Sequence, residues 1–219
     1  MALYIVATPI GNLEDISFRV IKVLNEVDLI LAEDTRRTSI LLNHYKVKNK
    51  IESFNDFNKE KKTPSIIEQL KNNKRIAIVS DSGTPGISDP GFYLVREAVK
   101  EGIDIVPIPG ANAAITALVS SGFATDKFMF LGFLPKKENR LKKSLMEIKK
   151  NNITTIFYES PYRIEKTLRL MSEIIPDKKI CIARELTKKF EEFIRGTASE
   201  ILKKKPKFKG EITVVVGKG

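Results

Sequence analysis

The chain has 219 residues, 42% of them hydrophobic, so it is expected to bury one large core or two modest ones as a globular protein. No apolar run approaches the roughly eighteen residues of a membrane-spanning helix, and no basic segment precedes the short apolar N-terminal stretch, so we expect a cytoplasmic protein with no membrane partner. One cysteine and one histidine exclude an intrachain disulfide and a zinc or iron site built from those residues, while the net charge of +11 favours a polyanionic partner.

The first half alternates short β-rich runs with amphipathic segments, which is the pattern of a mostly parallel sheet flanked by helices. Apolar residues at helical spacing predict helices at Phe18–Glu26 and Phe92–Lys100. The predicted strands are Leu3–Ala7, Asp28–Ala32, Arg75–Ser80 and Ile103–Ile108. In open α/β sheets ligands bind outside the carboxyl ends of the strands, so we expect the chemistry in the loops after these four strands.

The first of these loops, ATPIGNL from Ala7 to Leu13, follows a strand and precedes a helix, as a cofactor-binding loop does. It contains one glycine where a dinucleotide-binding fingerprint needs three, so it does not predict a pyrophosphate site. A plain structural turn explains Pro9 and Gly11 equally well.

The second loop places adjacent acids, Glu33 and Asp34, next to adjacent arginines, Arg36 and Arg37. One interpretation is that Asp34 or Thr35 caps the helix that follows. The other is that a carboxylate orients or deprotonates an acceptor hydroxyl while an arginine holds a nearby phosphate. The sequence leaves both interpretations open.

The most unusual segment, VSDSGTPGISDPG from Val79 to Gly91, packs three glycines, two prolines and two aspartates after a β-rich run. A turn alone needs far less. Such a loop can present backbone amides, carbonyls and short side chains to a small polar ligand, and its glycines let the ligand approach the main chain closely. Without a Walker lysine in the loop, phosphate binding is disfavoured.

Past Pro109-Gly110, a helix of small residues is predicted at Ala111–Ser121, and a second domain follows it. Its predicted strands are Phe128–Phe133, Thr154–Glu159, Lys179–Arg184, Glu192–Gly196 and Glu211–Val216, and its predicted helices are Glu138–Lys150, Tyr162–Ile175 and Ala198–Lys204. Short links between the later strands indicate some antiparallel pairing. We therefore predict two α/β domains, 1–110 with a mostly parallel sheet and 111–219 with a mixed sheet.

In this domain the segment FYESPYR, from Phe157 to Arg163, places polar and aromatic residues at the end of a predicted strand. Tyr158 there is suited to pack on an adenine or a methionyl group. The alternative is that the aromatic residues belong to the core and that Ser160-Pro161 is an ordinary helix start. Cys181, in the apolar stretch ICIA, is expected to be a small buried hydrophobe, and His44 an ordinary helix residue.

The excess of positive charge lies entirely in the second half. Residues 1–110 hold 15 Lys and Arg against 15 Asp and Glu, whereas residues 111–219 hold 23 against 12. The densest basic stretches, Lys136–Lys143 and Lys203–Lys209, are suited to neutralise the phosphates of a nucleic acid. The alternative is a compositional habit, because 28 lysines against 10 arginines also fit a merely solvated surface.

Seven segments of the sequence carry a resemblance to a known family. They are ATPIGNLEDIS, AEDTRRT, SDSGTPGISDPG, PIPGANAAITAL, FLGFLP, FYESPYRI and RELTKKFEE. In this order and spacing they resemble the ribosomal RNA small subunit methyltransferase I family, and the resemblance spans nearly the whole chain. It implies a tetrapyrrole-methylase fold of two α/β domains with S-adenosylmethionine in the cleft between them, and a homodimer. It also implies methylation of the ribose 2′-hydroxyl of a decoding-centre cytidine in 16S rRNA, free or in the small ribosomal subunit.

The resemblance also implies which residues bind the methyl donor. By motif they are Pro9, Ser82, Gly83, Thr84, Ile87, Asn112 and Ala113, with Tyr158 and Leu186 from the second domain. Family members often continue beyond the last strand with a further helical segment, whereas this sequence ends at Gly219. We therefore expect the grip on RNA, but not the donor site, to differ from theirs.

A sulfonium donor is strongly electrophilic, so the protein mainly has to align the acceptor oxygen and exclude water. The ribose hydroxyl is a poor acid near neutral pH, so Glu33 or Asp34 is expected to help remove its proton, with Arg36 as a third catalytic residue. Arg36 and Arg37 are expected to hold the flanking phosphate. Three basic residues of the second half are expected to steer the rRNA, namely Lys136, Lys137 and Arg140.

Two alternatives remain at this stage. One is a methylase that acts on a small tetrapyrrole or on a protein side chain, because this fold serves methylases of these substrates as well as of rRNA. The other is a non-catalytic RNA-binding assembly factor. The basic second half argues against the first alternative, and the intact SDSGTPGISDPG loop argues against the second.

Overall fold

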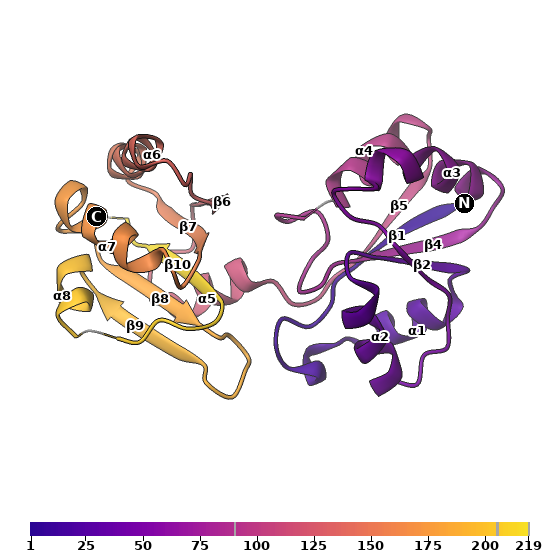
Figure 1. Cartoon of the computed structure of the whole chain (residues 1–219), viewed down its shortest axis with the longest axis horizontal. Coiled ribbons are helices and arrows are strands. Elements are labelled where there is room, and N and C mark those ends of the chain that lie inside the picture. The colour runs from indigo at the N-terminus through magenta and orange to yellow at the C-terminus, as the bar shows by residue number, and fades with distance from the viewer. Residues whose placement is uncertain (90, 205, 219) are drawn as a thin grey trace. The chain divides into compact units, whose positions relative to one another are not determined.

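A computed structural model of the protein describes residues 1–89, 91–204 and 206–218. The chain divides into Met1–Asn112, here called unit 1, and Ala113–Gly219, called unit 2, each with its own five-stranded sheet (Figure 1). Unit 1 extends past Gly110 because the hydroxyl of Thr84 donates a hydrogen bond to the carbonyl of Ala111 (3.2 Å). This contact holds the segment after the last strand of unit 1 against its own unit.

The sheet of unit 1 is parallel throughout, with the strand order β3-β2-β4-β1-β5. The strands are β1 (Ala2–Val6), β2 (Leu29–Ala32), β3 (Ile51–Ser53), β4 (Arg75–Val79) and β5 (Asp104–Ile108). The inner strand β2 is apolar throughout, and β4 is apolar after the exposed Arg75, as strands covered on both faces require. Pro107 lies in β5, an edge strand, where its missing N–H costs least.

Helices cover both faces of this sheet (Figure 1). They are α1 (Phe18–Glu26), α2 (Thr35–His44), α3 (Lys59–Lys71) and α4 (Gly91–Lys100), with a short 3-10 turn η1 (Leu13–Asp15) before α1. Successive residues of a strand point to opposite faces. Accordingly, Ile76 packs in the core beneath α3 and α4, and Ala77 packs in the core beneath α1 and α2. The result is a three-layer unit.

Two elements of unit 1 were absent from the sequence-based predictions, β3 and α3. The strand is only three residues long. Helix α3 opens with charged residues and contains Pro64, and its buried apolar residues Ile66, Ile67 and Leu70 lie in its second half. The amphipathic signal was therefore too short to predict a helix. By contrast, α1 begins and ends as predicted, because the Ser17 hydroxyl accepts a hydrogen bond from Val20 N (3.2 Å).

The sheet of unit 2 is mixed, with the strand order β6-β7-β10-β8-β9, as predicted for this half. The strands are β6 (Phe128–Phe133), β7 (Thr154–Glu159), β8 (Ile180–Arg184), β9 (Glu192–Gly196) and β10 (Ile212–Val216). The pair β6 and β7 is parallel, and the other pairs are antiparallel. The central strand β10 is buried along its whole length.

Helix α5 (Ala113–Ser121) packs on one face of this sheet against β7, β8 and β10. Helices α6 (Glu138–Asn151), α7 (Ile164–Ile174) and α8 (Ala198–Lys203) share the core of the other face. Leu145, Leu168 and Ile201, one from each helix, are fully buried there. Unit 2 is therefore also a three-layer arrangement, with its own core.

Two predicted helices of unit 2 begin later than expected. The helix predicted at Ala111–Ser121 starts at Ala113, because the carbonyl of Ala111 bonds to Thr84 instead. The helix predicted at Tyr162–Ile175 starts at Ile164, because the Ser160 carbonyl accepts turn hydrogen bonds from Arg163 N and Ile164 N. Tyr162 is left 96% exposed before the helix.

The two residues assigned to ordinary structural positions lie as predicted. Cys181 is fully buried in β8, and burial raises the pKa of its thiol. His44 is the last residue of α2. In the described ranges no helix combines the length and apolar character needed to cross a membrane, and no cluster of His, Cys, Asp or Glu is arranged to hold a metal ion.

A buried carboxylate connects the end of β7 to α7. The side chain of Glu159 accepts hydrogen bonds from the Thr167 hydroxyl (2.7 Å) and from Ser160 N (2.8 Å), and it lies 3.5 Å from Arg163 Nε. A buried charge is tolerated only when its oxygens have such partners. Thr167 therefore contributes to stability through the carboxylate that it satisfies.

Thr167→Val is expected to lower the free energy of unfolding by about 1–3 kcal/mol, because it leaves a carboxylate oxygen of buried Glu159 without its donor. Urea denaturation followed by circular dichroism measures the change. Ser172→Ala, on the same helix, removes only an exposed hydroxyl bond to Arg169 O and is expected to change stability by less than about 0.5 kcal/mol. Equal stability of Thr167→Val and the wild type would contradict this role.

Candidate active site

The loops after β1 and β4 meet at the point where the chain of unit 1 changes direction. β1 and β4 are neighbours, yet β1 connects through α1 toward the β3 side, whereas β4 connects through α4 to β5 at the opposite edge. In open α/β sheets ligands bind at such a switch point. Here Thr8 N donates to Gly83 O (2.9 Å) and Gly83 N donates to Thr8 O (3.1 Å), so the two loops are joined.

The loop after β5 joins the same place. Gly83 has φ +85°, and a side chain there would lie 3.3 Å from Ile10 Cγ2 and 3.5 Å from the Ala111 carbonyl. At Gly110 a Cβ atom would come within 2.9 Å of Ala7 Cβ. Gly83 therefore needs the backbone freedom of glycine, and a side chain at Gly110 would collide with Ala7. The structure thus brings together the loops that carry Pro9, Ser82–Thr84 and Asn112.

The shape of the loop after β4 is fixed from within. Asp89 Oδ1 accepts hydrogen bonds from Gly86 N (2.6 Å) and Gly91 N (2.9 Å). Burial raises the pKa of Asp89, although these two hydrogen bonds oppose the rise. Ser82 and Ile87, two of the expected donor-binding residues, remain exposed on this loop. The loop is thus internally braced and presents these two residues outward.

Asp34 is engaged by the helix that it begins. Its Oδ1 accepts hydrogen bonds from Arg36 N (2.9 Å) and Arg36 Nε (3.0 Å), and its Oδ2 accepts one from Arg36 Nη2 (2.6 Å). The Arg36 side chain lowers the pKa of Asp34 to about 2. The capping interpretation is therefore confirmed for Asp34, and so tightly held a carboxylate is a weak base near neutral pH.

Asp81 links the loops after β2 and β4, and the sequence-based reasoning did not single it out. Its Oδ1 accepts a hydrogen bond from Asp34 N (2.9 Å), and its Oδ2 lies 3.6 Å from Arg37 Nε. The role of Asp81 follows from the pairing of β2 with β4. The sequence gives no strand order, so only the topology identifies this contact.

Glu33, next in sequence to Asp34, lies in the opposite electrostatic environment. Burial raises its pKa, and the nearby carboxylates of Asp81, Asp89 and Asp56 raise it further. Asp56 comes from the loop between β3 and α3, the segment that the sequence-based predictions missed. Glu33 therefore accepts a proton more readily than Asp34 does.

The donor-binding residues expected in unit 2 lie at the carboxyl ends of two strands of its sheet, β7 and β8. β7 and β8 are each antiparallel to β10, so they run in the same direction and end at the same edge. Tyr158, in β7, packs edge-on against Phe130 and Phe133, and its hydroxyl is hydrogen-bonded to the backbone of Ala114, next to Ala113. Leu186, just past β8, is buried. Burial raises the pKa of the Tyr158 phenol.

The alternative interpretation of the FYESPYR segment is only partly met. Phe157 is fully buried in the core, as that interpretation requires. Tyr158 is only half-buried, and Tyr162 is almost fully exposed. A ring face of Tyr158 turned to a ligand is therefore compatible with its packing.

The expected RNA-binding residues come from both units. Arg37, on α2 of unit 1, is exposed despite its contact with Asp81. Lys136, Lys137 and Arg140 lie at the beginning of α6 in unit 2, and all three side chains are exposed. Within the described part of the chain, none of these three side chains forms an ion pair. The beginning of α6 therefore presents positive charge that the protein itself does not neutralise.

The chain thus has two α/β units, a parallel sheet with a loop at its switch point that Asp89 holds together, followed by a mixed sheet. Solved structures with this fold include the methyltransferase CobJ, with a TM-score of 0.71, 18% identity and coverage of 100% of this chain and 93% of that one. Uroporphyrin-III-C-methyltransferase from Thermus thermophilus has a TM-score of 0.66 and 16% identity, with coverage of 99% of this chain and 94% of that one. These likenesses establish the fold.

Residues 2–202 match the family described as Tetrapyrrole (Corrin/Porphyrin) Methylases, and the chain belongs to this family. It is 52% identical over 218 residues to a Thermotoga maritima protein named Ribosomal RNA small subunit methyltransferase I, covering 98% of this chain and 97% of that protein. Proteins of the same name from Halalkalibacterium halodurans and Bacillus subtilis are 50% and 49% identical, over 98% of this chain and 75% and 74% of theirs. The resemblance drawn from the sequence is confirmed.

Glu33→Gln is expected to raise the free energy of unfolding at pH 7. The pKa of Glu33 in the folded protein lies above its ordinary value of 4.5, so folding penalises the ionised carboxylate. The penalty is full at neutral pH and disappears below the ordinary pKa, where the group is protonated in both states. The gain should therefore be present at pH 7 and lost as the pH falls below 4.5.

Urea denaturation of both proteins across this pH range measures the effect. Glu14→Gln, on the exposed η1 turn, provides a control with the same change of charge and is expected to leave stability unchanged. If Glu33→Gln is no more stable than the wild type at pH 7, burial and the nearby carboxylates do not penalise the charge of Glu33 as inferred.

Proposed function

We propose that this protein is an S-adenosylmethionine-dependent methyltransferase that methylates the ribose 2′-hydroxyl of a decoding-centre cytidine in 16S rRNA. The observation that carries the proposal is identity of about half the residues, over 98% of the chain, to proteins named Ribosomal RNA small subunit methyltransferase I. The two solved methyltransferases described above are below 20% identical and support the fold alone. We further propose a cytoplasmic homodimer that acts on 16S rRNA or on the small ribosomal subunit.

The loops of unit 1 fit the methyl donor. Gly110 is exposed on the loop after β5, and a nucleoside can approach its main chain closely because it carries no side chain. We assign donor binding to the residues named by the resemblance, each half (1–110 and 111–219) contributing as a domain. They are Pro9, Ser82, Gly83, Thr84, Ile87, Asn112, Ala113, Tyr158 and Leu186.

S-adenosylmethionine bound at these loops would supply an electrophilic methyl group on a positively charged sulfur, and the sulfur would keep the electron pair of the broken bond. The chain must then accept the proton of the ribose hydroxyl, and Glu33 is the better placed carboxylate, because burial and its acidic neighbours raise its pKa. Asp34 holds Arg36 at the start of α2. Arg36 and Arg37, both exposed, hold the phosphate beside the acceptor ribose, and Lys136, Lys137 and Arg140 steer the rRNA.

Glu33→Gln is expected to slow single-turnover methyl transfer by about 10²–10⁴-fold, the usual contribution of a general base. The wild-type rate should fall as the pH drops through the raised pKa of Glu33, and the variant should lack this dependence. Asp34→Asn keeps a capping side chain and should cost far less. A larger loss in Asp34→Asn than in Glu33→Gln would reverse the assignment of the base.

The function itself is tested with purified protein, S-adenosylmethionine carrying a labelled methyl group, and either 16S rRNA or small subunits. We expect one labelled 2′-O-methylcytidine per rRNA, located by mapping the ribose methylation. Titration calorimetry should show that the protein binds S-adenosylmethionine. Binding of RNA with no donor binding would indicate an assembly factor instead, and label transferred to a tetrapyrrole but not to rRNA would indicate a small-substrate methylase.

A further inference from the structure

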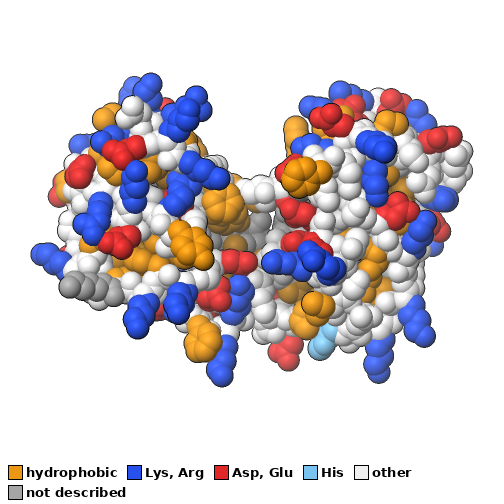
Figure 2. Space-filling view, viewed as in Figure 1, with side chains coloured by type: hydrophobic (Ala, Val, Ile, Leu, Met, Phe, Trp, Pro, Cys, Tyr) orange, Lys and Arg blue, Asp and Glu red, His pale blue; other side chains and the backbone are white. Residues whose placement is uncertain are grey.

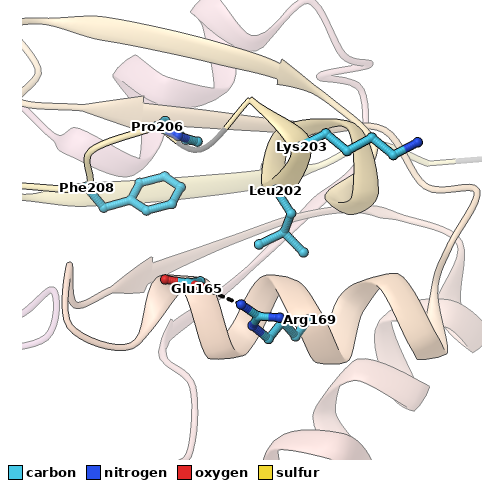
Figure 3. A pocket seen from close by; sticks show the side chains of 6 residues that line it. All are labelled: Glu165, Arg169, Leu202, Lys203, Pro206 and Phe208. Carbon is cyan, nitrogen blue, oxygen red and sulfur yellow. Dashed lines mark hydrogen bonds and ion pairs between the residues drawn. The ribbon is translucent and has the colours of Figure 1, made fainter.

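A groove of about 490 Å³ lies in unit 2 between α7 and the chain that follows α8 (Figure 3). Leu202 and Phe208 line it and also pack against the core of the unit, so its apolar floor is supported from below. Glu165 and Arg169 of α7 form one wall, and Lys203 lies on the opposite side. The volume falls within the range of about 300–1,000 Å³ that is usual for sites of small organic groups.

The groove is bordered by positive charge that has no partner among the described residues. Its one lining carboxylate, Glu165, is already bonded to Arg169 Nη2 (2.6 Å; dashed line in Figure 3). Four exposed lysines of this segment form no ion pair or side-chain hydrogen bond within the described ranges, namely Lys203, Lys204, Lys207 and Lys209. Elsewhere in unit 2, Lys179 and Lys188 do bond to carboxylates. The groove therefore favours an anionic occupant.

The basic beginning of α6 contacts α7, the helix that forms one wall of the groove. Lys166, next to Glu165 on α7, forms an ion pair with Glu138 at the start of α6 (2.8 Å). The expected RNA-steering residues Lys136, Lys137 and Arg140 flank Glu138 in sequence. Figure 2 shows Lys and Arg side chains spread over the face of unit 2 that carries α6, α7 and α8. A chain of phosphates can therefore follow one continuous helical layer.

We propose that this groove binds an unpaired nucleotide of the rRNA substrate, with its base against Phe208 and its phosphates beside Lys203 and Lys207. The inference rests on the proposed function. An inorganic anion needs no apolar floor, and an acidic protein segment offers a ring for Phe208 only where it contains an aromatic residue, whereas every nucleotide couples a phosphate to a flat base. Single-stranded RNA offers both a backbone for cationic side chains and bases that stack on aromatic ones.

The test measures binding of a fluorescent single-stranded 16S rRNA fragment by anisotropy over a series of salt concentrations. The double variant Lys203→Ala/Lys207→Ala should bind about tenfold more weakly at low salt, with a salt slope reduced by about 1.4, since each contact on a single strand contributes roughly 0.7. Phe208→Leu keeps an apolar floor and should lose at least about fivefold in affinity with an unchanged slope.

Lys149→Ala/Lys150→Ala, at the exposed far end of α6, makes the same change of charge and should bind RNA like the wild type. The proposal is overturned if the groove double variant binds RNA as tightly as this control. It is also overturned if polyglutamate of matched charge binds as tightly as the RNA and loses as much affinity in Phe208→Leu. The failures are separable. Wild-type protein that binds RNA through the groove but transfers no methyl group would refute only the proposed function.

Discussion

Two backbone hydrogen bonds between Thr8 and Gly83 hold together the loops on which the candidate active site depends. They form because β1 and β4 are neighbours whose connections leave in opposite directions, so their loops are not covered by the same crossover helix. They also require glycine at position 83, since its φ of +85° is rare for other residues. The backbone conformation of Gly83 thereby determines where the loops after β1 and β4 meet.

Two adjacent carboxylates after β2, Glu33 and Asp34, have pKa values shifted in opposite directions. Hydrogen bonds from Arg36 lower the pKa of Asp34 to about 2. Burial and nearby acidic side chains raise the pKa of Glu33. Titratable neighbours whose pKa values are driven apart are typical of sites that divide acid–base work between them. The environment of Glu33 disfavours its charged form, and such a cost in stability is commonly retained at positions that serve function.

The sequence predicted most of the fold, because long apolar periodic segments such as Phe18–Glu26 determine their own structure. It missed α3, whose apolar residues are confined to one half, and with it the approach of Asp56 to Glu33. The unusual composition of the loop after β4 was visible, but its contacts were not. The link from Asp81 to Asp34 depends on which strands pair, and no local pattern encodes that pairing.

The two halves of the chain differ in charge. Residues 1–110 are balanced, with 15 basic and 15 acidic side chains, and they hold the loops that meet at Gly83. Residues 111–219 carry 23 basic against 12 acidic side chains, many of them exposed and unpaired within the described ranges. At 16–18% identity, the two solved methyltransferases share the fold of this chain. Under the proposed function, the charge of the second half can favour a polyanionic acceptor without any change of the core, since long-range charge attracts polyanions.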